Sequence, residues 1–445
     1  METLKVQILI IGGGVAGLNC ALNLSTEDVV LIENNGSNSL LSAWNLTGAK
    51  RETLKEEMLT SGGGLNDKKL LEVFLDNLQK AVKDLRKIGV EFRKSNIGLI
   101  PVYLFPGVEI RKIFLEKLER KKIKIINGKV IKFLIDKKGK IRGVEAVLPK
   151  QKNKIIIFFN YLVLASGGLS GFFNFKTGSE GCDGSIISLC NDAGLRTRDI
   201  NSFMIHPLLI TDERFPRVLL SGDLLTKMTF EDEEEEKFLS PKSTLALKTG
   251  KHHSLFEEMG REFYIQSKKG KIFCKIKCSD HWFENFKKNN EFGYIFKNFK
   301  RGDIGKIEIH PAFHYLSGGI AVNERAQTSQ EHIYAAGEIV GGLHGKNRVG
   351  GTAIIEAMVF AKIAANQINQ EMIDNGKAVG IPVKIKRVGS LGLSEKMKER
   401  AWKFMLFGRK NDLKIMNTFL KKKTLSSQEK LLKTIIASYL TSKTR

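Results

Sequence analysis

Residues 6–17 read V-Q-I-L-I-I-G-G-G-V-A-G, an apolar run that leads directly into a glycine-rich turn. Val6 to Ile11 has the pattern of a buried strand, and a helix is expected from about Ala16 to Leu24. A second apolar run, Val29 to Ile32, predicts another buried strand and is followed by Glu33. The order strand, helix, strand predicts a βαβ unit, the unit from which a parallel, doubly wound sheet is built.

The glycines of this turn have the G-x-G-x-x-G spacing that is typical of dinucleotide-binding turns. They allow a tight turn, a close approach of the backbone to a pyrophosphate and close packing of helix on strand. The first amides of the helix add donors and partial positive charge, and an acid after the second strand can accept hydrogen bonds from a ribose hydroxyl. A glycine turn without a ligand is the alternative, but the flanking strands and the acid favour a nucleotide. The residues expected to contact it are Gly12, Gly14, Val15, Ala16, Gly17, Glu33 and Asn34.

Length and charge limit the classes of protein to consider. The 445 residues suffice for two or three domains. A formal net charge of +24 fits nucleic acid or an anionic membrane surface, an anionic substrate and cofactor, or a lysine-rich composition without functional meaning. The lysines are spread along the chain without interleaved aromatic residues, which favours the last interpretation. The N-terminus has no secretory pattern and no apolar run reaches 18 residues, so we expect a soluble, cytoplasmic protein.

The cysteines indicate reduced thiols. Their number is odd, and they form no CxxC or CxxCH motif, which argues against a disulfide framework, a c-type haem and an iron–sulfur cluster. No metal site is expected. The five residues are Cys20, Cys182, Cys190, Cys274 and Cys278.

Further along the chain, the apolar periodicity predicts additional helices and strands around the first unit. Helices are expected at Asp67 to Ile88, Arg111 to Glu119 and Thr352 to Gln370, and the basic tail from Ser394 to Thr444 is also expected to be helical. Strands are expected at Lys154 to Leu164 and Ile333 to Ala336. Two further stretches alternate like the strands of a small separate sheet, Lys124 to Asp136 and Ile141 to Val147.

The βαβ rhythm is lost beyond His206 and returns at Gly318, which indicates an inserted domain. We therefore expect an α/β fold with a discontinuous, Rossmann-like nucleotide-binding domain, an inserted α+β capping domain and a helical C-terminal tail. This layout places a ligand site at a domain interface. The expected boundaries are 1–207 and 305–375 for the nucleotide-binding domain, 208–304 for the capping domain and 376–445 for the tail.

Two later segments indicate which nucleotide is bound, because they resemble known flavin-binding signatures. L-V-L-A-S-G-G at 162–168 resembles the second such signature, and I-Y-A-A-G-E at 333–338 resembles the third. H-P-A-F-H-Y-L-S-G-G-I-A-V-N at 310–323 and G-G-L-H-G-K-N-R-V-G-G-T-A-I at 341–354 then resemble the flavoprotein family of fumarate reductase, succinate dehydrogenase and L-aspartate oxidase. The resemblance extends over about residues 5–370.

The resemblance implies that the cofactor is FAD and that it is held non-covalently. Membrane-complex relatives attach FAD through a histidine near the loop that follows the second strand, whereas the first histidine of this chain is His206. That linkage therefore cannot form here. Besides the residues of the first turn, those implied to contact FAD are Ala165, Ser166, Gly167, Gly337, Glu338, Arg348, Thr352, Ala353 and Ile354.

The resemblance also implies a C4 dicarboxylate substrate lying against the flavin ring. His206, His314 and Arg348 match the family residues that bind the carboxylates, and the planar fork of an arginine suits that task. Arg261 is the best match for the arginine that delivers a proton, because it also precedes a short helix and a strand. A surface position on a helix is the alternative for Arg261. His344 is equally suited to orienting the flavin loop.

The chain departs from the family pattern in two places. S-A-W-N-L-T-G-A at 42–49 replaces the Gln-Gly-Gly loop that normally wraps the flavin. L-L-S-G-D-L-L at 219–225 is the nearest stretch to the family's Thr-Glu, with Ser221 in place of the threonine and no acid. These departures weaken the assignment of fumarate or aspartate as substrate and leave the flavin assignment intact.

Four hypotheses follow from these patterns. The first is hydride transfer between FAD and fumarate or succinate, with a possible electron-transfer partner protein. The second is L-aspartate oxidase, which oxidises aspartate to iminoaspartate for NAD biosynthesis. The third is a degenerate flavin-binding subunit without C4 chemistry. The fourth is an RNA-modifying flavoprotein, which only the net charge supports, so we expect no specific nucleic acid partner.

Overall fold

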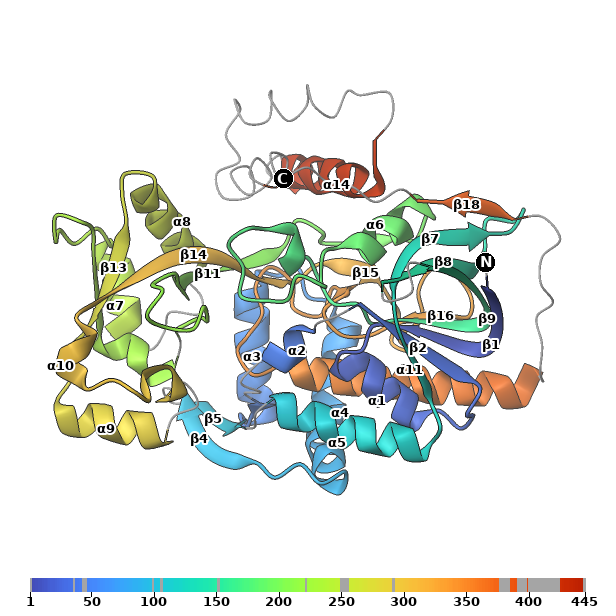
Figure 1. Cartoon of the computed structure of the whole chain (residues 1–445), viewed down its shortest axis with the longest axis horizontal. Coiled ribbons are helices and arrows are strands. Elements are labelled where there is room, and N and C mark those ends of the chain that lie inside the picture. Colours follow the sequence, from blue (N-terminus) through green and yellow to red (C-terminus); the bar gives the residue numbers. More distant parts are fainter. Residues whose placement is uncertain are drawn as a thin grey trace.

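The computed structural model has a large α/β body and a smaller lobe beside it (Figure 1). The strand β14 (Lys306–Leu316) runs from the smaller lobe into the body. The structure describes residues 2–34, 37–41, 46–97, 100–104, 107–149, 153–220, 222–248, 256–289, 293–375, 385–389, 398 and 425–442.

The body is built on a sheet that, within the described residues, has eight strands. Its centre is parallel, because β1 pairs with β2 on one side and with β9 on the other, and β16 runs parallel to β9. The first βαβ unit therefore forms as predicted, around strands that are almost fully buried. The strands are β1 (Glu2–Ile11), β2 (Val29–Glu33), β6 (Lys124–Asn127), β7 (Lys129–Ile135), β8 (Ile141–Leu148), β9 (Asn153–Leu164), β16 (Ile333–Ala335) and β18 (Lys386–Val388).

The prediction of a small separate sheet over Lys124 to Val147 is wrong. β6 is a parallel strand that pairs with β2, while β7 and β8 pair antiparallel and continue the same sheet beside β9. Asn127 and Lys129 belong to two strands that Gly128 separates, so the stretch predicted as one strand joins the sheet at two distant positions.

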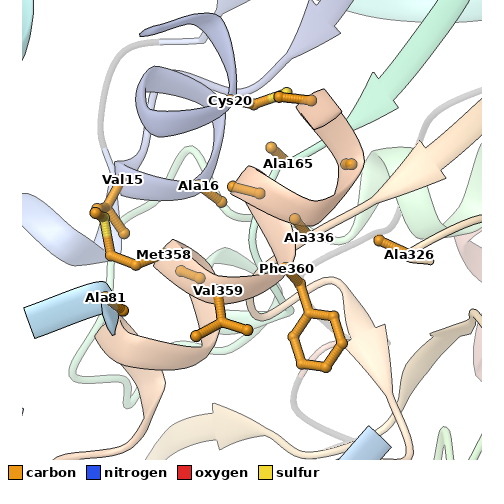
Figure 2. Close-up of a cluster of buried hydrophobic side chains, with 14 of the residues drawn as sticks. Val15, Ala16, Cys20, Ala81, Ala165, Ala326, Ala336, Met358, Val359 and Phe360 are labelled. Carbon is orange, nitrogen blue, oxygen red and sulfur yellow. The ribbon is translucent and has the colours of Figure 1, made fainter. Parts of the chain in front are cut away.

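Helices cover both faces of the sheet (Figure 1). One face carries α1, α4, α5 and α11, and the other carries α6 and α14. The close packing of α1 against α11 uses small side chains such as Ala16, Cys20 and Ala336 between larger ones such as Met358 and Phe360 (Figure 2). The helices of the body are α1 (Val15–Asn23), α2 (Asn38–Leu41), α3 (Arg51–Gly62), α4 (Lys68–Lys87), α5 (Gly107–Arg120), α6 (Ser185–Asp192), α11 (Ala353–Asn375) and α14 (Ser427–Ser442), with the short helix η1 (Ser170–Phe172).

The smaller lobe has its own apolar core between Leu208 and Ile309. Its antiparallel sheet has the strand order β11-β14-β13-β12, and α8 packs against β11 and β14. The domain boundaries given above remain a prediction, and the two strands that enter the body, β11 and β14, extend across them. The elements are β11 (Phe203–Ile210), η2 (Gly222–Lys227), β12 (Met228–Glu231), α7 (Pro241–Lys248), α8 (Phe256–Ser267), β13 (Ile272–Ile276), α9 (Asp280–Asn289), η4 (Gly293–Phe296) and α10 (Arg301–Ile304).

Two small sheets and the C-terminal helix complete the body. Leu431, Leu432, Ile435 and Ile436 of α14 are buried against the same face of the large sheet as α6, so this part of the tail belongs to the core. Within the described residues, none of the helices has the length and apolar character needed to cross a membrane. The small sheets contain β3 (Leu46–Thr47), β4 (Arg93–Ile97) and β5 (Ile100–Leu104), and β10 (Thr197–Arg198), β15 (Gly319–Ala321) and β17 (Val340–Gly341).

Candidate active site

The three glycine-containing turns lie together at the carboxyl ends of adjacent strands. Ile11 of β1, Leu164 of β9 and Ala335 of β16 stand in one row of the sheet. The next residues of these strands are Gly12, Ala165 and Ala336, so the turns that follow them begin side by side. Ligands of doubly wound folds bind outside the carboxyl ends of the strands, where this site lies.

Glycines hold the three turns in contact. A Cβ atom at Gly12, whose φ is +120°, would overlap the carbonyl of Ala165. A Cβ at Gly168 would overlap the Glu338 carboxylate, and a Cβ at Gly337 would lie 3.1 Å from the Cβ of Ala16. Each turn therefore approaches the next one more closely than a side chain would permit.

Glu33 ends β2 and is held by an arginine that sequence reasoning did not identify. Nη1 and Nη2 of Arg111, in α5, donate to the two carboxylate oxygens of Glu33 at 3.0 and 2.7 Å. Nη1 also donates to the carbonyl of Gly13 at 3.0 Å. The arginine thus fixes the acid beside the glycine turn. No motif marks Arg111, because it lies 78 residues beyond Glu33 on a different element.

Glu338 follows β16 and accepts hydrogen bonds from two segments of the chain. Asn38 Nδ2 donates to one oxygen at 2.8 Å, and the backbone N–H of Leu316 donates to the other at 3.1 Å. The Oδ1 atom of Asn38 in turn accepts from the N–H of Ser179 at 2.7 Å. Burial raises the pKa of Glu338 to about 7, although the bond from Asn38 and the nearby Arg348 favour its charged form. Sequence reasoning missed Asn38, which lies just before the altered flavin loop.

Arg348 and His314 contact each other, and His206 lies beside His314. Nη2 of Arg348 lies 3.2 Å from Nε2 of His314, and the rings of His206 and His314 have centroids 5.6 Å apart. Because an arginine only donates, Nε2 of His314 must accept and Nδ1 carries the hydrogen. That hydrogen is donated to Oγ1 of Thr177 at 2.7 Å. Thr177 is a further residue that no motif indicated.

The tautomer of His206 follows from its backbone contact. Its Nδ1 accepts a hydrogen bond from the N–H of Leu208 at 3.2 Å, so in the neutral ring the hydrogen lies on Nε2. The side chain is 3% exposed. His206 therefore has a donor at Nε2 in both of its protonation states.

The guanidinium of Arg348 is buried and lacks a carboxylate partner within the described residues. Its Nη1 donates to the carbonyl of Val349 at 3.0 Å, and its Nε has no hydrogen-bond partner in that part of the chain. Burial lowers the pKa of Arg348 below its usual value, while Tyr315, Glu338 and Glu356 act in the opposite direction. An arginine remains charged under these conditions, so the described part of the site has a desolvated cation that lacks an anion.

A buried group of polar residues lies beneath Arg348. The guanidinium carbon is 4.6 Å from the centroid of the Tyr315 ring. The hydroxyl of Tyr315 donates to Oε2 of Glu356 at 2.8 Å, and Nε2 of His344 lies 2.9 Å from the same oxygen. His344 thus belongs to the layer that supports the site.

Arg261 lies within α8 of the smaller lobe and not ahead of a helix as its sequence context suggested. Its side chain is partly exposed. The preceding residue, Gly260, packs against Ile205 of β11, and Ile205 is followed by His206. The helix that carries Arg261 therefore lies against the strand that carries one of the three predicted carboxylate ligands.

The other predicted site residues occupy the turns or their borders. Thr352 ends the loop before α11 and donates from its hydroxyl to the carbonyl of Val349 at 2.6 Å. Ala353 and Ile354 begin α11, while Val15, Ala16 and Gly17 begin α1. Residues 42–45 of the altered loop and Ser221 lie outside the described residues. The described residues contain no cluster of histidine, cysteine and carboxylate side chains that could hold a metal ion.

These features fit a dinucleotide with a flavin ring. The first amides of α1 and the glycine turn suit the pyrophosphate, Glu33 suits a ribose hydroxyl, and Glu338 suits the hydroxyls of a ribityl chain. Nε of Arg348, which has no partner among the described residues, leaves a buried donor beside the third turn.

Comparison with known proteins agrees with this geometry. A family model described as "FAD binding domain" matches residues 7–231 and 274–354. The chain belongs to this family. It is a FAD-dependent oxidoreductase of the group that includes fumarate reductase, succinate dehydrogenase and L-aspartate oxidase, as the sequence motifs predicted.

Individual relatives are distant but cover most of the chain. L-aspartate oxidase of Clostridium perfringens is 27% identical over 404 residues, which are 83% of this chain and 88% of the relative. The L-aspartate oxidase of Bacillus subtilis is 27% identical over 83% of this chain and 73% of its own. A fumarate reductase (CoM/CoB) polypeptide of Methanothermobacter marburgensis is 23% identical over 82% of this chain and 72% of its own. A variant of FrdA from the E. coli quinol fumarate reductase has the same fold, with a TM-score of 0.72 and 17% identity over 98% of this chain and 78% of its own.

Proposed function

We propose that this FAD-dependent oxidoreductase acts on a C4 dicarboxylate of the fumarate and succinate type. The observation that carries the proposal is the buried guanidinium of Arg348, which lies against His314 and has no carboxylate partner among the described residues. An anionic ligand would supply the missing charge, because a desolvated cation is stable only when it is paired.

The side chains around Arg348 suit a ligand with two carboxylates. Arg348 binds one of them through its planar fork, and the Nε2–H of His206 donates to the ligand. His314 accepts from Arg348 before the ligand arrives and is held in that tautomer by Thr177. When bound, FAD exchanges a hydride with a carbon of the substrate. The proton is delivered by Arg261, whose helix packs beside the strand of His206.

Aspartate is the second candidate substrate, because the relative that covers 88% of its own length is an L-aspartate oxidase. The side chains that we place on the substrate favour fumarate or succinate over aspartate. Arg348 and His206 offer donors, and donors match carboxylates but not the ammonium group of an amino acid.

The test is an anaerobic experiment on the purified protein with FAD. Fumarate should reoxidise a reduced dye in the presence of the enzyme, and succinate should change the flavin spectrum. An Arg348→Met variant should retain FAD and lose more than about a hundredfold in kcat/KM, since it lacks a charge-assisted bond to each substrate. A variant with unchanged turnover, or a flavin-loaded wild type that responds to neither compound, would reject the proposal. Peroxide release with aspartate alone would select the second candidate.

An Arg261→Lys variant tests the proton donor separately. It should lower kcat with little change in the affinity for succinate, because the residue acts on the reacting carbon and not on the carboxylates. Equal loss of succinate binding would instead place Arg261 among the carboxylate ligands.

A further inference from the structure

Glu356, in the first turn of α11, is a carboxylate that neither FAD nor the substrate requires. The residue is 0% exposed. Its Oε2 atom is shared by the hydroxyl of Tyr315 and Nε2 of His344, and its Oε1 atom has no partner among the described residues. A buried acid costs free energy unless it is hydrogen-bonded or paired, so its presence needs a compensating role.

The hydrogen bonds of this group fix both aromatic rings. Burial raises the pKa of the Tyr315 hydroxyl well above its usual value, so the phenol remains protonated and donates to Glu356. The second bond to the same oxygen requires a hydrogen on Nε2 of His344. The two rings meet edge to face with centroids 5.6 Å apart. One carboxylate oxygen therefore orients two side chains that also contact each other.

Tyr315 connects this group to the substrate site. The Arg348 guanidinium lies over its ring, and a phenol that donates to a carboxylate has a more electron-rich ring, which strengthens the attraction for a cation. His314, the preceding residue of β14, contacts the Nη2 atom of the same guanidinium. The position of Arg348 thus depends on Tyr315 below it and on His314 at its tip.

Building on the proposed function, we infer that Glu356 is a positioning residue for the substrate site. It fixes Tyr315 and His344 and thereby holds the Arg348 guanidinium where a substrate carboxylate binds. The negative charge of Glu356 also opposes the binding of a dianion. That charge is shared with His344 and makes no direct ion pair with Arg348, so we expect the loss of positioning to outweigh the loss of repulsion.

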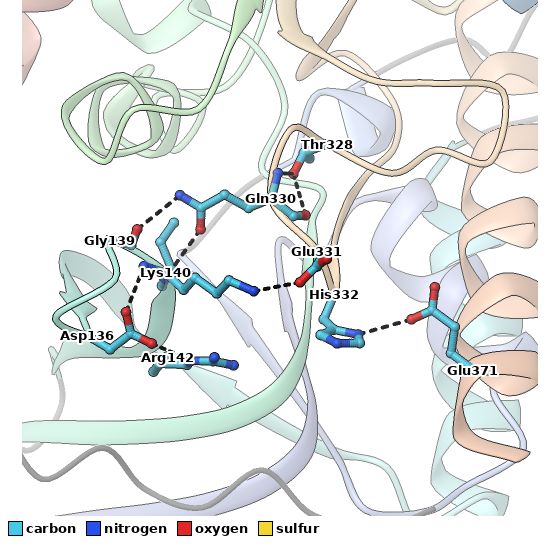
Figure 3. Close-up of polar contacts among 10 residues, drawn as sticks. Asp136, Gly139, Lys140, Arg142, Thr328, Gln330, Glu331, His332 and Glu371 are labelled. Carbon is cyan, nitrogen blue, oxygen red and sulfur yellow. Dashed lines mark hydrogen bonds and ion pairs between the residues drawn. The ribbon is translucent and has the colours of Figure 1, made fainter. Parts of the chain in front are cut away.

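The same helix supplies a matched control near its other end. Glu371 also accepts a hydrogen bond from a tyrosine hydroxyl, that of Tyr334, and also pairs with a histidine, Nδ1 of His332 at 3.1 Å. Figure 3 shows that this histidine follows Glu331, which pairs with Lys140. The guanidinium of Arg348 bonds instead to His314 and Val349, away from this group.

The experiment compares the flavin-loaded Glu356→Gln, Tyr315→Phe and Glu371→Gln variants with the wild type. The dissociation constant of succinate is measured from the flavin spectrum, and kcat and KM are measured with fumarate. Glu356→Gln should weaken succinate binding and raise KM by about tenfold or more, with normal flavin content. Tyr315→Phe should act in the same direction but less strongly, because the ring remains. Glu371→Gln should leave both constants unchanged.

The outcomes separate this inference from the proposed function. If the wild type responds to succinate but Glu356→Gln and Tyr315→Phe bind it equally well, Glu356 is not a positioning residue. Tighter binding by Glu356→Gln would show that the carboxylate acts only as a repelling charge and would also overturn the inference. If Glu356→Gln does not retain FAD, Tyr315→Phe decides. A flavin-loaded wild type without any response rejects the proposed function and, with it, this role of Glu356.

Discussion

Glu338 links the flavin site to the stability of the whole chain, and pH is the perturbation that reveals this. Burial raises its pKa from the usual 4.5 to about 7. Hydrogen bonds from Asn38 and from the N–H of Leu316 favour the ionised carboxylate but do not offset the burial. The folded protein without flavin therefore binds a proton at this position more tightly than the unfolded chain does.

The sign and size of the effect follow from linkage. Because the folded pKa is raised, the contribution of Glu338 to stability is fully present below pH 4.5 and is lost as the pH rises through 7. One pKa unit corresponds to about 1.4 kcal/mol. Between pH 5 and pH 8, the loss in the free energy of unfolding should be about 2 to 3 kcal/mol.

The assay is urea unfolding of the flavin-free wild type and of Glu338→Gln at several pH values between 5 and 8. The glutamine amide must face one of the two donors, so the variant carries a cost that does not depend on pH. The variant should nevertheless gain about 2 to 3 kcal/mol relative to the wild type as the pH rises, because it cannot ionise. Parallel stability curves for the two proteins would refute this reasoning.

Three further substitutions test other parts of the fold and site. Arg111→Met should weaken FAD binding about tenfold in a fluorescence titration, because Glu33 loses the arginine that orients it; unchanged affinity would assign this ion pair to stability alone. Gly12→Ala should abolish flavin binding, measured from the absorbance of the purified protein, because the new Cβ overlaps the carbonyl of Ala165. Phe313→Ala should lower the free energy of unfolding by about 3 to 5 kcal/mol in urea, because the side chain is fully buried and stacks on Phe173 at 4.7 Å; a loss below about 1 kcal/mol would contradict the packing described.

Local patterns predicted the parts of the fold in which one segment determines its own structure. The turn after β1 and the helix from Lys68 to Lys87 are of this kind: α4 begins at Asp67, whose carboxylate accepts from the backbone N–H groups of Lys69 and Leu70. The stretch from Lys124 to Val147 failed because its alternation marks strands but not their partners. Pairing with β2 and β9 is a property of the folded sheet.

The candidate site shows the same division. His314 and Arg348 stand in long motifs, so the sequence alone indicated them. Asn38, Arg111 and Thr177 have no motif, and each acts through a partner that is distant in the sequence. Thr177 contacts His314 across 137 residues. Such supporting residues become visible only when the chain is folded, because their role is defined by the atom that they touch.

The close contacts between the three glycine turns couple cofactor binding to the register of the central sheet. Gly12 faces Ala165 only because Ile11 is paired with Leu164, and Gly337 approaches Ala16 only because β16 continues the same row beside β9. A shift of one residue in β9 would exchange its buried and exposed faces and separate the first two turns. The glycines therefore select the register as well as admit the nucleotide. For this reason a substitution at Gly12 should reduce flavin affinity and stability together, whereas one at Arg348 should affect ligand binding with little change in stability.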